Sequence, residues 1–307
     1  MMYDVTVIGE IYQDHVFSGF KAWPAPGDEV FTDQYEWELG GGAVTTACAL
    51  ARLGRSVQLI GVAGEMDMPR VTSRLKDFGI GIDGIVSSRM RSGVTMSVST
   101  REDRSFFTYR GANVELEARL LDDTERLRQA SHARHVHLAM PLSTQLAAHA
   151  LPLLRALHAT TSLDVGHHVG WLRDEASLDV LRSVDYTMPN EKEASLFSGD
   201  PTRYLAKCRS LGLRNALVKL GRQGAVMMRD GCEFRASSPD VSVVDTTGAG
   251  DVFDAGFIDA LLDNKTPQEM LAEACACGAL STRAAGALRA LPTQHEIRTM
   301  LKENYAA

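Results

Sequence analysis

The sequence of 307 residues contains no apolar run of the about 20 residues that a membrane-spanning helix requires. It does not open with a basic stretch followed by an apolar segment, so no secretory signal is expected. Lys and Arg total 32 against 39 Asp and Glu, a net charge of −7 without a long run of either sign. This balance argues against non-specific binding to nucleic acid or to anionic membranes. We therefore expect a cytoplasmic protein with neither partner.

Cysteine is also scarce. The five cysteines, Cys48, Cys208, Cys232, Cys275 and Cys277, are scattered and form no C-x-x-C pair. Such a set indicates neither a disulfide framework nor a zinc site. The His-Glu-x-x-His motif of zinc proteases and the P-loop motif G-x-x-x-x-G-K-[ST] are both missing. The sequence thus gives no support to either of those two enzyme classes.

What the sequence does contain is an alternation of short apolar runs with helical patterns. The apolar runs that predict strands lie at 3–8, 57–60, 135–138, 162–165, 186–188, 216–220 and 225–229. Helical patterns occupy 43–53, 69–78, 144–158, 191–198, 202–211, 251–262 and 267–284. Several strands are apolar almost throughout, which is typical of a parallel sheet covered on both faces. We predict an α/β fold with a mostly parallel central sheet between helices.

Two stretches break this alternation. Residues 10–39 place aromatic side chains among Pro and Gly, and residues 95–112 begin with the alternating pattern of an antiparallel ribbon. We expect the two stretches to form a small β-sheet that stands off the main body. No linker composition divides the chain, so residues 1–307 are predicted to form one domain.

Two glycine motifs are candidates for phosphate binding. The first, GIGIDG at 79–84, follows a helical pattern instead of a strand, so Gly79 is better interpreted as the glycine that ends a helix. The second, DTTGAGD at 245–251, follows an apolar segment and opens a helical pattern. Its glycines permit a sharp turn and expose amide groups at a helix start, where an anion is favoured.

Asp251 ends the second motif. A carboxylate beside an anion hole can accept the proton of an attacking hydroxyl while the amides stabilise charge on a phosphate. The structural alternative is that Asp251 caps the helix, since Asp is common at that position. The residues around Asp251 leave both interpretations open.

The stretch VDTTGAGDVF at 244–253 resembles the carboxyl-terminal motif of the ribokinase-like carbohydrate kinases, the PfkB family. Three further motifs follow the family order: GGGAVTTACALARLG at 40–54, MPNEKEA at 188–194 and VKLGRQGA at 218–225. The resemblance implies a ribokinase-like fold with a β-sheet lid. It also implies transfer of the γ-phosphate of ATP to a hydroxyl, a primary one, of a small sugar or sugar derivative. Asp251 would be the general base, and the amides of Gly248, Ala249 and Gly250 the anion hole.

The resemblance extends to the cofactors ATP and Mg²⁺. Asn190 and Glu193 match positions that organise magnesium and phosphate, often through water; a capping box at a helix start is the alternative. Lys219, Gly221, Gly224 and Thr246 fall along the nucleotide path. Because Lys219 replaces the Thr that is common in ribokinases, a strand-end lysine that faces water is an equal alternative.

Some members of the family also bind a monovalent cation beside the anion hole. The matching positions for K⁺ are Asp245, Thr247, Ala284 and Gly286. Lids often pair in the family, so a homodimer through the lid is expected, with Phe17, Trp23 and Phe31 at its interface.

At the substrate end, Asp14 matches the acid that binds sugar hydroxyls, with an ordinary turn Asp as the alternative. Gly40 and Gly41 match hinge glycines. Thr45 stands where Asn is usual, which puts ribose itself in doubt.

Two further positions at this end differ from the family or allow more than one role. His167 and His168 replace the family's Asp-Pro-Asn segment. Arg110 would meet an anionic substrate group or the γ-phosphate, or remain solvated.

Two other functions stay open. A nucleoside kinase of the same fold would stack a base against lid aromatics. A catalytically silent sensor of sugar or nucleotide would bind without turnover. A sensor needs no base, so the presence of Asp251 favours an enzyme.

Overall fold

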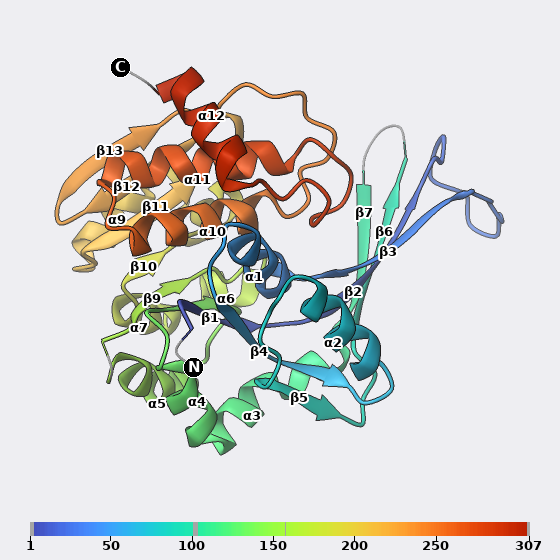
Figure 1. Ribbon diagram of the computed structural model, residues 1–307, viewed down its shortest axis with the longest axis horizontal. Coiled ribbons are helices and arrows are strands. Elements are labelled where there is room, and N and C mark those ends of the chain that lie inside the picture. Colours follow the sequence, from blue (N-terminus) through green and yellow to red (C-terminus); the bar gives the residue numbers. More distant parts are fainter. Residues whose placement is uncertain (1–2, 101–103, 157, 306–307) are drawn as a thin grey trace.

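The computed structural model describes residues 3–100, 104–156 and 158–305. Residues 101–103 of the second predicted lid stretch, and residue 157 of the predicted helix 144–158, lie outside the described residues. Figure 1 shows a central sheet between helices and a smaller sheet that projects from one side of this main body.

The central sheet has six strands in the order β10-β9-β8-β1-β4-β5, and every neighbouring pair is parallel. The strands are β1 (Val5–Gly9), β4 (Val57–Gly64), β5 (Ile85–Ser88), β8 (His135–Ala139), β9 (Thr160–Leu163) and β10 (Tyr186–Thr187). Strands β1 and β4 are buried along their whole length, as expected for strands that are covered on both faces. The predicted fold class is confirmed.

Alternate residues of β1 and β4 contribute to two separate apolar clusters. In β1, Val7 belongs to one apolar cluster and Ile8 to the other. The first cluster packs against α1 (Gly42–Arg52), α2 (Met68–Asp77), α10 (Ala249–Leu262), α11 (Pro267–Ser281) and α12 (Gln294–Tyr305). The second packs against α3 (Leu116–Asp122), α4 (Thr124–Ala130), α5 (Thr144–Arg155), α6 (Val169–Arg173), α7 (Ser177–Ser183), α8 (Glu191–Ser198) and α9 (Tyr204–Ser210).

Two predicted strands lie outside the central sheet. Strands β11 (Asn215–Lys219), β12 (Ala225–Arg229) and β13 (Cys232–Ala236) form an antiparallel sheet of three strands. β11 still follows on from the central sheet, because the amide of Lys219 donates to the carbonyl of Pro189, 3.0 Å away, just beyond β10. The apolar runs alone did not show this change of direction.

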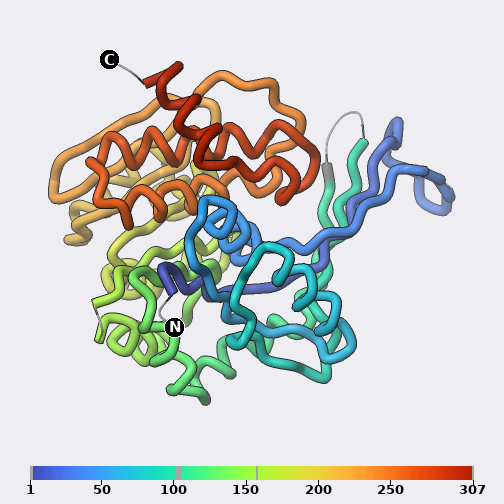
Figure 2. The backbone as a smooth tube through the Cα atoms, in the orientation of Figure 1, coloured from blue at the N-terminus to red at the C-terminus, as the bar shows by residue number. Residues whose placement is uncertain are grey.

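The small sheet that was expected from the two irregular stretches is present. It contains β2 (Tyr12–Ser18), β3 (Gln34–Gly40), β6 (Gly93–Ser99) and β7 (Arg104–Tyr109), in the order β3-β2-β6-β7. We call it the outer sheet. β2 follows β1 after only two residues, and the tube in Figure 2 shows the β2–β3 segment extending beyond the body.

Several predicted boundaries were wrong. α10 begins at Ala249, because Gly248, with φ 75°, is its N-cap, so Asp251 is the third helical residue and not the cap. The strand predicted at 162–165 ends at Leu163, α5 ends at Arg155 and α11 at Ser281. Gly79 has φ 74° directly after α2 and its cap residue, which confirms that it ends a helix.

No helix within the described ranges is long and apolar enough to cross a membrane.

Candidate active site

A cleft of about 740 Å³ opens where the carboxyl ends of the parallel strands meet the outer sheet. Ligand sites of open α/β sheets lie at this edge. The predicted residues that line it are Asp14, Gly41, Thr45, Arg110, His167, His168, Asn190, Glu193, Lys219, Thr247, Gly248, Gly250 and Asp251. Residues from distant parts of the sequence therefore converge on one cleft.

The start of α10 forms one wall of the cleft. Its first turn has no side-chain cap, which leaves amide groups for water or a ligand. The amide of Ala249 already has a partner, because it donates to the carbonyl of Thr246 at 3.2 Å. Of the three predicted anion-hole residues, Gly248 and Gly250 line the cleft. A Cβ on Gly248 would lie 2.7 Å from the Cβ of Ala287, so glycine is required here by space as well as by its positive φ.

Asp251 is partly buried and points toward the start of α1. A Cβ on Gly42 would lie 2.9 Å from its Oδ1, which shows how closely the carboxylate approaches that glycine. Burial, with the nearby carboxylate of Asp164, raises the pKa of Asp251 to about 7, although Lys219 opposes the rise. A group that titrates near neutral pH is suited to general-base chemistry.

Lys219 does not face water, so that alternative was wrong. Its side chain is 9% exposed, and Nζ donates to Oδ2 of Asp164 at 2.5 Å and to both carboxylate oxygens of Asp254 at 3.0 and 3.1 Å. The sequence analysis assigned no role to Asp164 or Asp254. The sequence does contain a signal for Asp254, because it is an acid within the apolar helical pattern of α10, three residues after Asp251.

Asn190 and Glu193 form the capping box that was considered as the structural alternative. The Oδ1 of Asn190 accepts from the Glu193 amide at 3.0 Å, and Oε2 of Glu193 accepts from the Asn190 amide at 2.8 Å. Both residues nevertheless line the cleft. Their carboxylate and amide oxygens are hard donors with spare lone pairs, and thus fit a Mg²⁺ ion that keeps part of its water shell.

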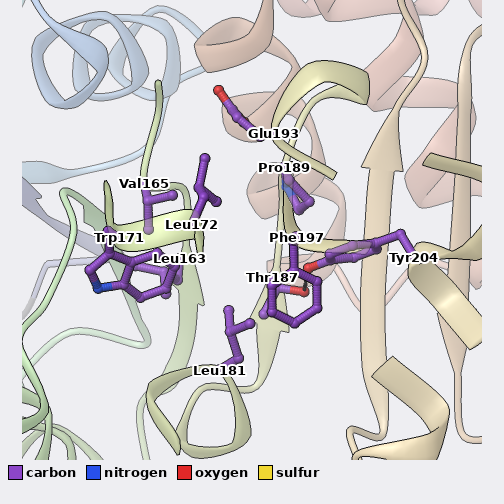
Figure 3. Close-up of a pocket in the computed structure, with 10 residues that line it drawn as sticks. All are labelled: Leu163, Val165, Trp171, Leu172, Leu181, Thr187, Pro189, Glu193, Phe197 and Tyr204. Carbon is purple, nitrogen blue, oxygen red and sulfur yellow. Dashed lines mark hydrogen bonds between the residues drawn. The ribbon is translucent and has the colours of Figure 1, made fainter. Parts of the chain in front are cut away.

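An apolar cavity of about 20 Å³, room for about one water molecule, lies beneath Glu193. Figure 3 shows Leu163, Leu172 and Phe197 among its walls, while the Glu193 carboxylate points away from it. Burial, together with the charge of Asp164, raises the pKa of Glu193 to about 7. A cation beside the carboxylate would favour its ionised form.

The residues expected to hold a monovalent cation lie in the loop before α10 and in the loop after α11. Oδ1 of Asp245 accepts from the amide and hydroxyl of Thr247, both at 2.8 Å, and Oδ2 accepts from the amide of Gly286 at 2.8 Å. Ala284 lies in the same loop as Gly286, after α11. Gly221 and Gly224 flank the turn between β11 and β12, and like Thr246 they do not line the cleft.

The outer sheet and the end of β1 form the end of the cleft where a sugar was expected, called the sugar end. Arg110 lines the cleft with its side chain half exposed, and its guanidinium pairs with Glu10; Nε lies 3.2 Å from Oε1. The hydroxyl of Tyr12 donates to Oε2 of Glu10 at 2.5 Å. Glu10 and Tyr12 also line the cleft, and sequence reasoning missed both. A charged residue directly after a largely apolar strand was the signal for Glu10.

Asp14 lies on β2 opposite Glu38 of β3. Burial, together with the charge of Glu38, raises the pKa of Asp14 to about 7. The Asp14 carboxylate occupies the space that a Cβ on Gly40 would need, so Gly40 shapes the cleft without lining it. Gly41 has φ 91° at the start of α1 and does line the cleft.

Thr45 and the paired histidines complete this end. Thr45 is 1% exposed, and its Cγ2 would lie 3.1 Å from a Cβ on Gly248. His168 has a lowered pKa because burial disfavours its charged form, despite the nearby Glu10. It therefore presents a neutral imidazole to the cleft at neutral pH.

Comparisons with known proteins agree over nearly the whole chain. The sequence pattern described as pfkB family carbohydrate kinase matches residues 2–294. A ribokinase of Haemophilus influenzae is 27% identical over 308 residues, which cover 97% of this chain and 98% of that protein. An ATP-dependent ribose-1-phosphate kinase of Halopiger xanaduensis is 30% identical over 269 residues and 87% of each chain.

The fold has equally clear counterparts among solved structures. The ribokinase of Arabidopsis thaliana, complexed with ribose and ATP, matches with a TM-score of 0.85 at 25% identity. The match covers 98% of this chain and 99% of that one. The central sheet, its helices and the outer sheet are thus a known arrangement.

Proposed function

The chain belongs to the pfkB family of carbohydrate kinases, and on that premise we propose that it transfers the γ-phosphate of ATP to a primary hydroxyl of a small sugar or sugar derivative. One observation carries the proposal. Asp251 faces the cleft from the first turn of α10, beside amides that no side chain caps. This combination supports a base next to an anion site, as phosphoryl transfer to a hydroxyl requires.

The proposed step is a direct transfer. Asp251 accepts the proton of the sugar hydroxyl, the hydroxyl oxygen bonds to the γ-phosphorus, and the bond from phosphorus to the β-phosphate oxygen breaks to release ADP. The amides of Gly248 and Gly250 stabilise the charge on the transferred group. A Mg²⁺ ion held through water by Asn190 and Glu193 would neutralise phosphate charge. The nucleotide would approach along Gly221, Gly224 and Thr246.

The residues around Asp245 support a role for K⁺. A monovalent cation beside Asp245 and Thr247, with the carbonyls of Ala284 and Gly286, would steady the loop that carries the anion hole. Turnover is expected to be faster in K⁺ than in tetramethylammonium at equal ionic strength, and equal rates would contradict this role.

The charge of the sugar end favours a neutral substrate. Glu10 and Asp14 are both acidic, and Arg110 is already paired with Glu10. The carboxylates, the Tyr12 hydroxyl and the neutral His168 suit sugar hydroxyls, whereas a phosphate or carboxylate on the sugar would meet negative charge. We infer that the substrate carries neither.

The outer sheet would act as the lid. Asp14, Thr95, Thr108 and Arg110, which lie on this sheet or at its end, line the cleft, so its movement over the sugar would exclude water. Its outward aromatic residues include Phe31, 84% exposed, and Trp23, which stacks on Phe107 with ring centroids 5.9 Å apart. An apolar surface of this kind supports a homodimer through the lid.

The test is ADP release with ATP and Mg²⁺ across neutral ketoses and aldoses, sugar phosphates, sugar acids and nucleosides. Turnover is expected with a neutral sugar. Turnover with sugar phosphates alone would overturn the assignment of a neutral substrate, and turnover with nucleosides alone would make the protein a nucleoside kinase. Binding of ATP and sugar without any turnover would favour a sensor.

A further inference from the structure

Beside the anion hole lies a cluster of one lysine and two aspartates, of which Lys219 and Asp164 also line the cleft. Lys219 bridges Asp164, which follows β9, and Asp254, which lies within α10. The side chain of Asp254 has 0% exposure, and those of Lys219 and Asp164 have 9% and 11%. We call these three residues the buried triad.

The buried triad adjoins the reacting groups without being the proposed base. A Cβ on Gly250 would lie 3.5 Å from Nζ of Lys219, so the ammonium lies just behind a residue of the anion hole. Carboxylate oxygens of Asp164, Asp251 and Asp254 lie within 4.8 Å of one another. Asp251 and Asp254 are three residues apart on α10 and therefore share one helix face.

Charge neutrality explains how such a cluster is tolerated. Burial alone would raise the pKa of Asp164, but Lys219 and hydrogen bonds outweigh it and lower that pKa to about 2. Burial raises the pKa of Asp254 well above its usual value, although Lys219 opposes the rise. One ammonium, one carboxylate and one protonated acid give no net charge, which is the favoured state away from water.

We propose that Lys219 is a positioning residue that acts as a fixed internal cation: held by Asp164 and Asp254, it favours the ionised form of the base Asp251. The titratable groups that face Asp251 are Asp164, Lys219, Glu193 and Asp14, with Asp254 on its own helix. Among them only Lys219 is cationic. Without it, the carboxylates of Asp164, Glu193 and Asp14 would favour the protonated form of Asp251 and hinder its role as a base.

The lysine also removes the need for a metal ion among these acids. Three carboxylates within 4.8 Å could otherwise hold a divalent cation. The ammonium is already within hydrogen-bond distance of two of them, so it supplies the positive charge as part of the chain. Because its charge does not depend on a bound ion, its effect on Asp251 would be present before Mg²⁺ and ATP enter.

The inference rests on Asp251 as the base, and its test is the pH dependence of kcat/KM for the sugar that turns over. Activity rises as Asp251 ionises. Lys219→Met removes a positive charge, so the pKa of Asp251 should rise. The acid limb of the pH profile should then move to a pH about one unit higher, which is a tenfold loss of kcat/KM at pH values below the limb. Asp164→Asn removes a negative charge and should move the limb down.

Two variants show whether the loss of charge or a change of side-chain shape moves the acid limb. Asp254→Asn replaces a protonated acid by a neutral group of similar size, so the limb should stay in place. Lys219→Met combined with Asp164→Asn restores neutrality, so its limb should return to within about half a pH unit of the parent. The double variant should also fold if Lys219→Met alone does not, because no buried charge is left unpaired.

Other outcomes overturn the proposal. If Lys219→Met lowers kcat equally at every pH and the double variant does not restore the limb, Lys219 contacts the transferred phosphate or has only a structural role. Titration of ¹³C-labelled aspartate by NMR, with Asp251→Asn to assign the signal, gives the pKa of Asp251 without any substrate. An unchanged pKa in Lys219→Met would refute the proposal even if the reaction were different, whereas a shifted pKa in a protein without turnover would count against the proposed function alone.

Discussion

At one end of the cleft, Asp251, Lys219 and Glu193 belong to helices and strands of the main body, whereas at the other end Asp14 and Arg110 come from the outer sheet. The first end is largely buried, with the Lys219 side chain 9% exposed. The second end is more open, with the Arg110 side chain 50% exposed. In the proposed function, the main body thus supplies the chemistry, and the more open end selects the sugar.

Among the variants that test this contrast, the largest effect on turnover is expected from Gly248→Ala, at the buried end of the cleft. The new Cβ would clash with Ala287 and force a positive φ on alanine, so the anion-hole amides would shift. We expect kcat to fall about 10²- to 10³-fold, the loss typical of a disturbed oxyanion hole, in a steady-state assay.

The matched control is Gly54→Ala. Gly54 also has a positive φ, 92°, but has open space around its Cβ and lies at the far end of α1. It should lose similar stability while kcat stays near the parent value. If both variants lose turnover equally, general destabilisation explains the loss.

A smaller effect is expected at the sugar end from Asp14→Asn. The amide has one acceptor oxygen in place of a carboxylate, so KM for the sugar should rise about 10- to 100-fold, as for a lost hydrogen bond to a charged group. KM for ATP should not change. An equal rise in both KM values would show that Asp14 supports the fold of the cleft instead of the sugar.

The pH dependence sharpens this prediction. Because the pKa of Asp14 is about 7, the parent's KM for the sugar should rise as the pH falls through 7 and Asp14 takes up a proton. Glu38→Gln removes the nearby carboxylate, lowers the pKa of Asp14 and should move that rise to lower pH. Asp14→Asn should abolish it.

The smallest kinetic effect is expected from Phe31→Glu at the outward surface of the outer sheet. A charge at a side chain that is 84% exposed should prevent lid pairing and leave the chemistry intact. Sedimentation should show a parent dimer and a variant monomer, with kcat changed by only a few-fold. Met66→Glu, at a residue 73% exposed outside the outer sheet, is the control and should stay dimeric. A parent that sediments as a monomer would exclude the dimer.

The same contrast explains what could be predicted from the sequence. The apolar strands and the DTTGAGD motif carry local signals, so the central sheet and the position of Asp251 could be predicted. The pairing of Lys219 with Asp254 is a contact between β11 and α10 that no local pattern records. Arg110 was expected to be free because its partner Glu10 lies 100 residues away in the sequence. The start of α10 was misplaced because a glycine N-cap with positive φ leaves no side-chain signature.

The most direct test of the central claim is the turnover of Asp251→Asn against the parent with the preferred sugar. An amide cannot accept the proton, so kcat should fall about 10²- to 10⁴-fold while KM for ATP and sugar changes little. Asp259→Asn, on the same helix but paired with Arg55 outside the cleft, should retain turnover per folded molecule. If Asp251→Asn turns over like the parent, Asp251 is not the base and the proposed mechanism is wrong.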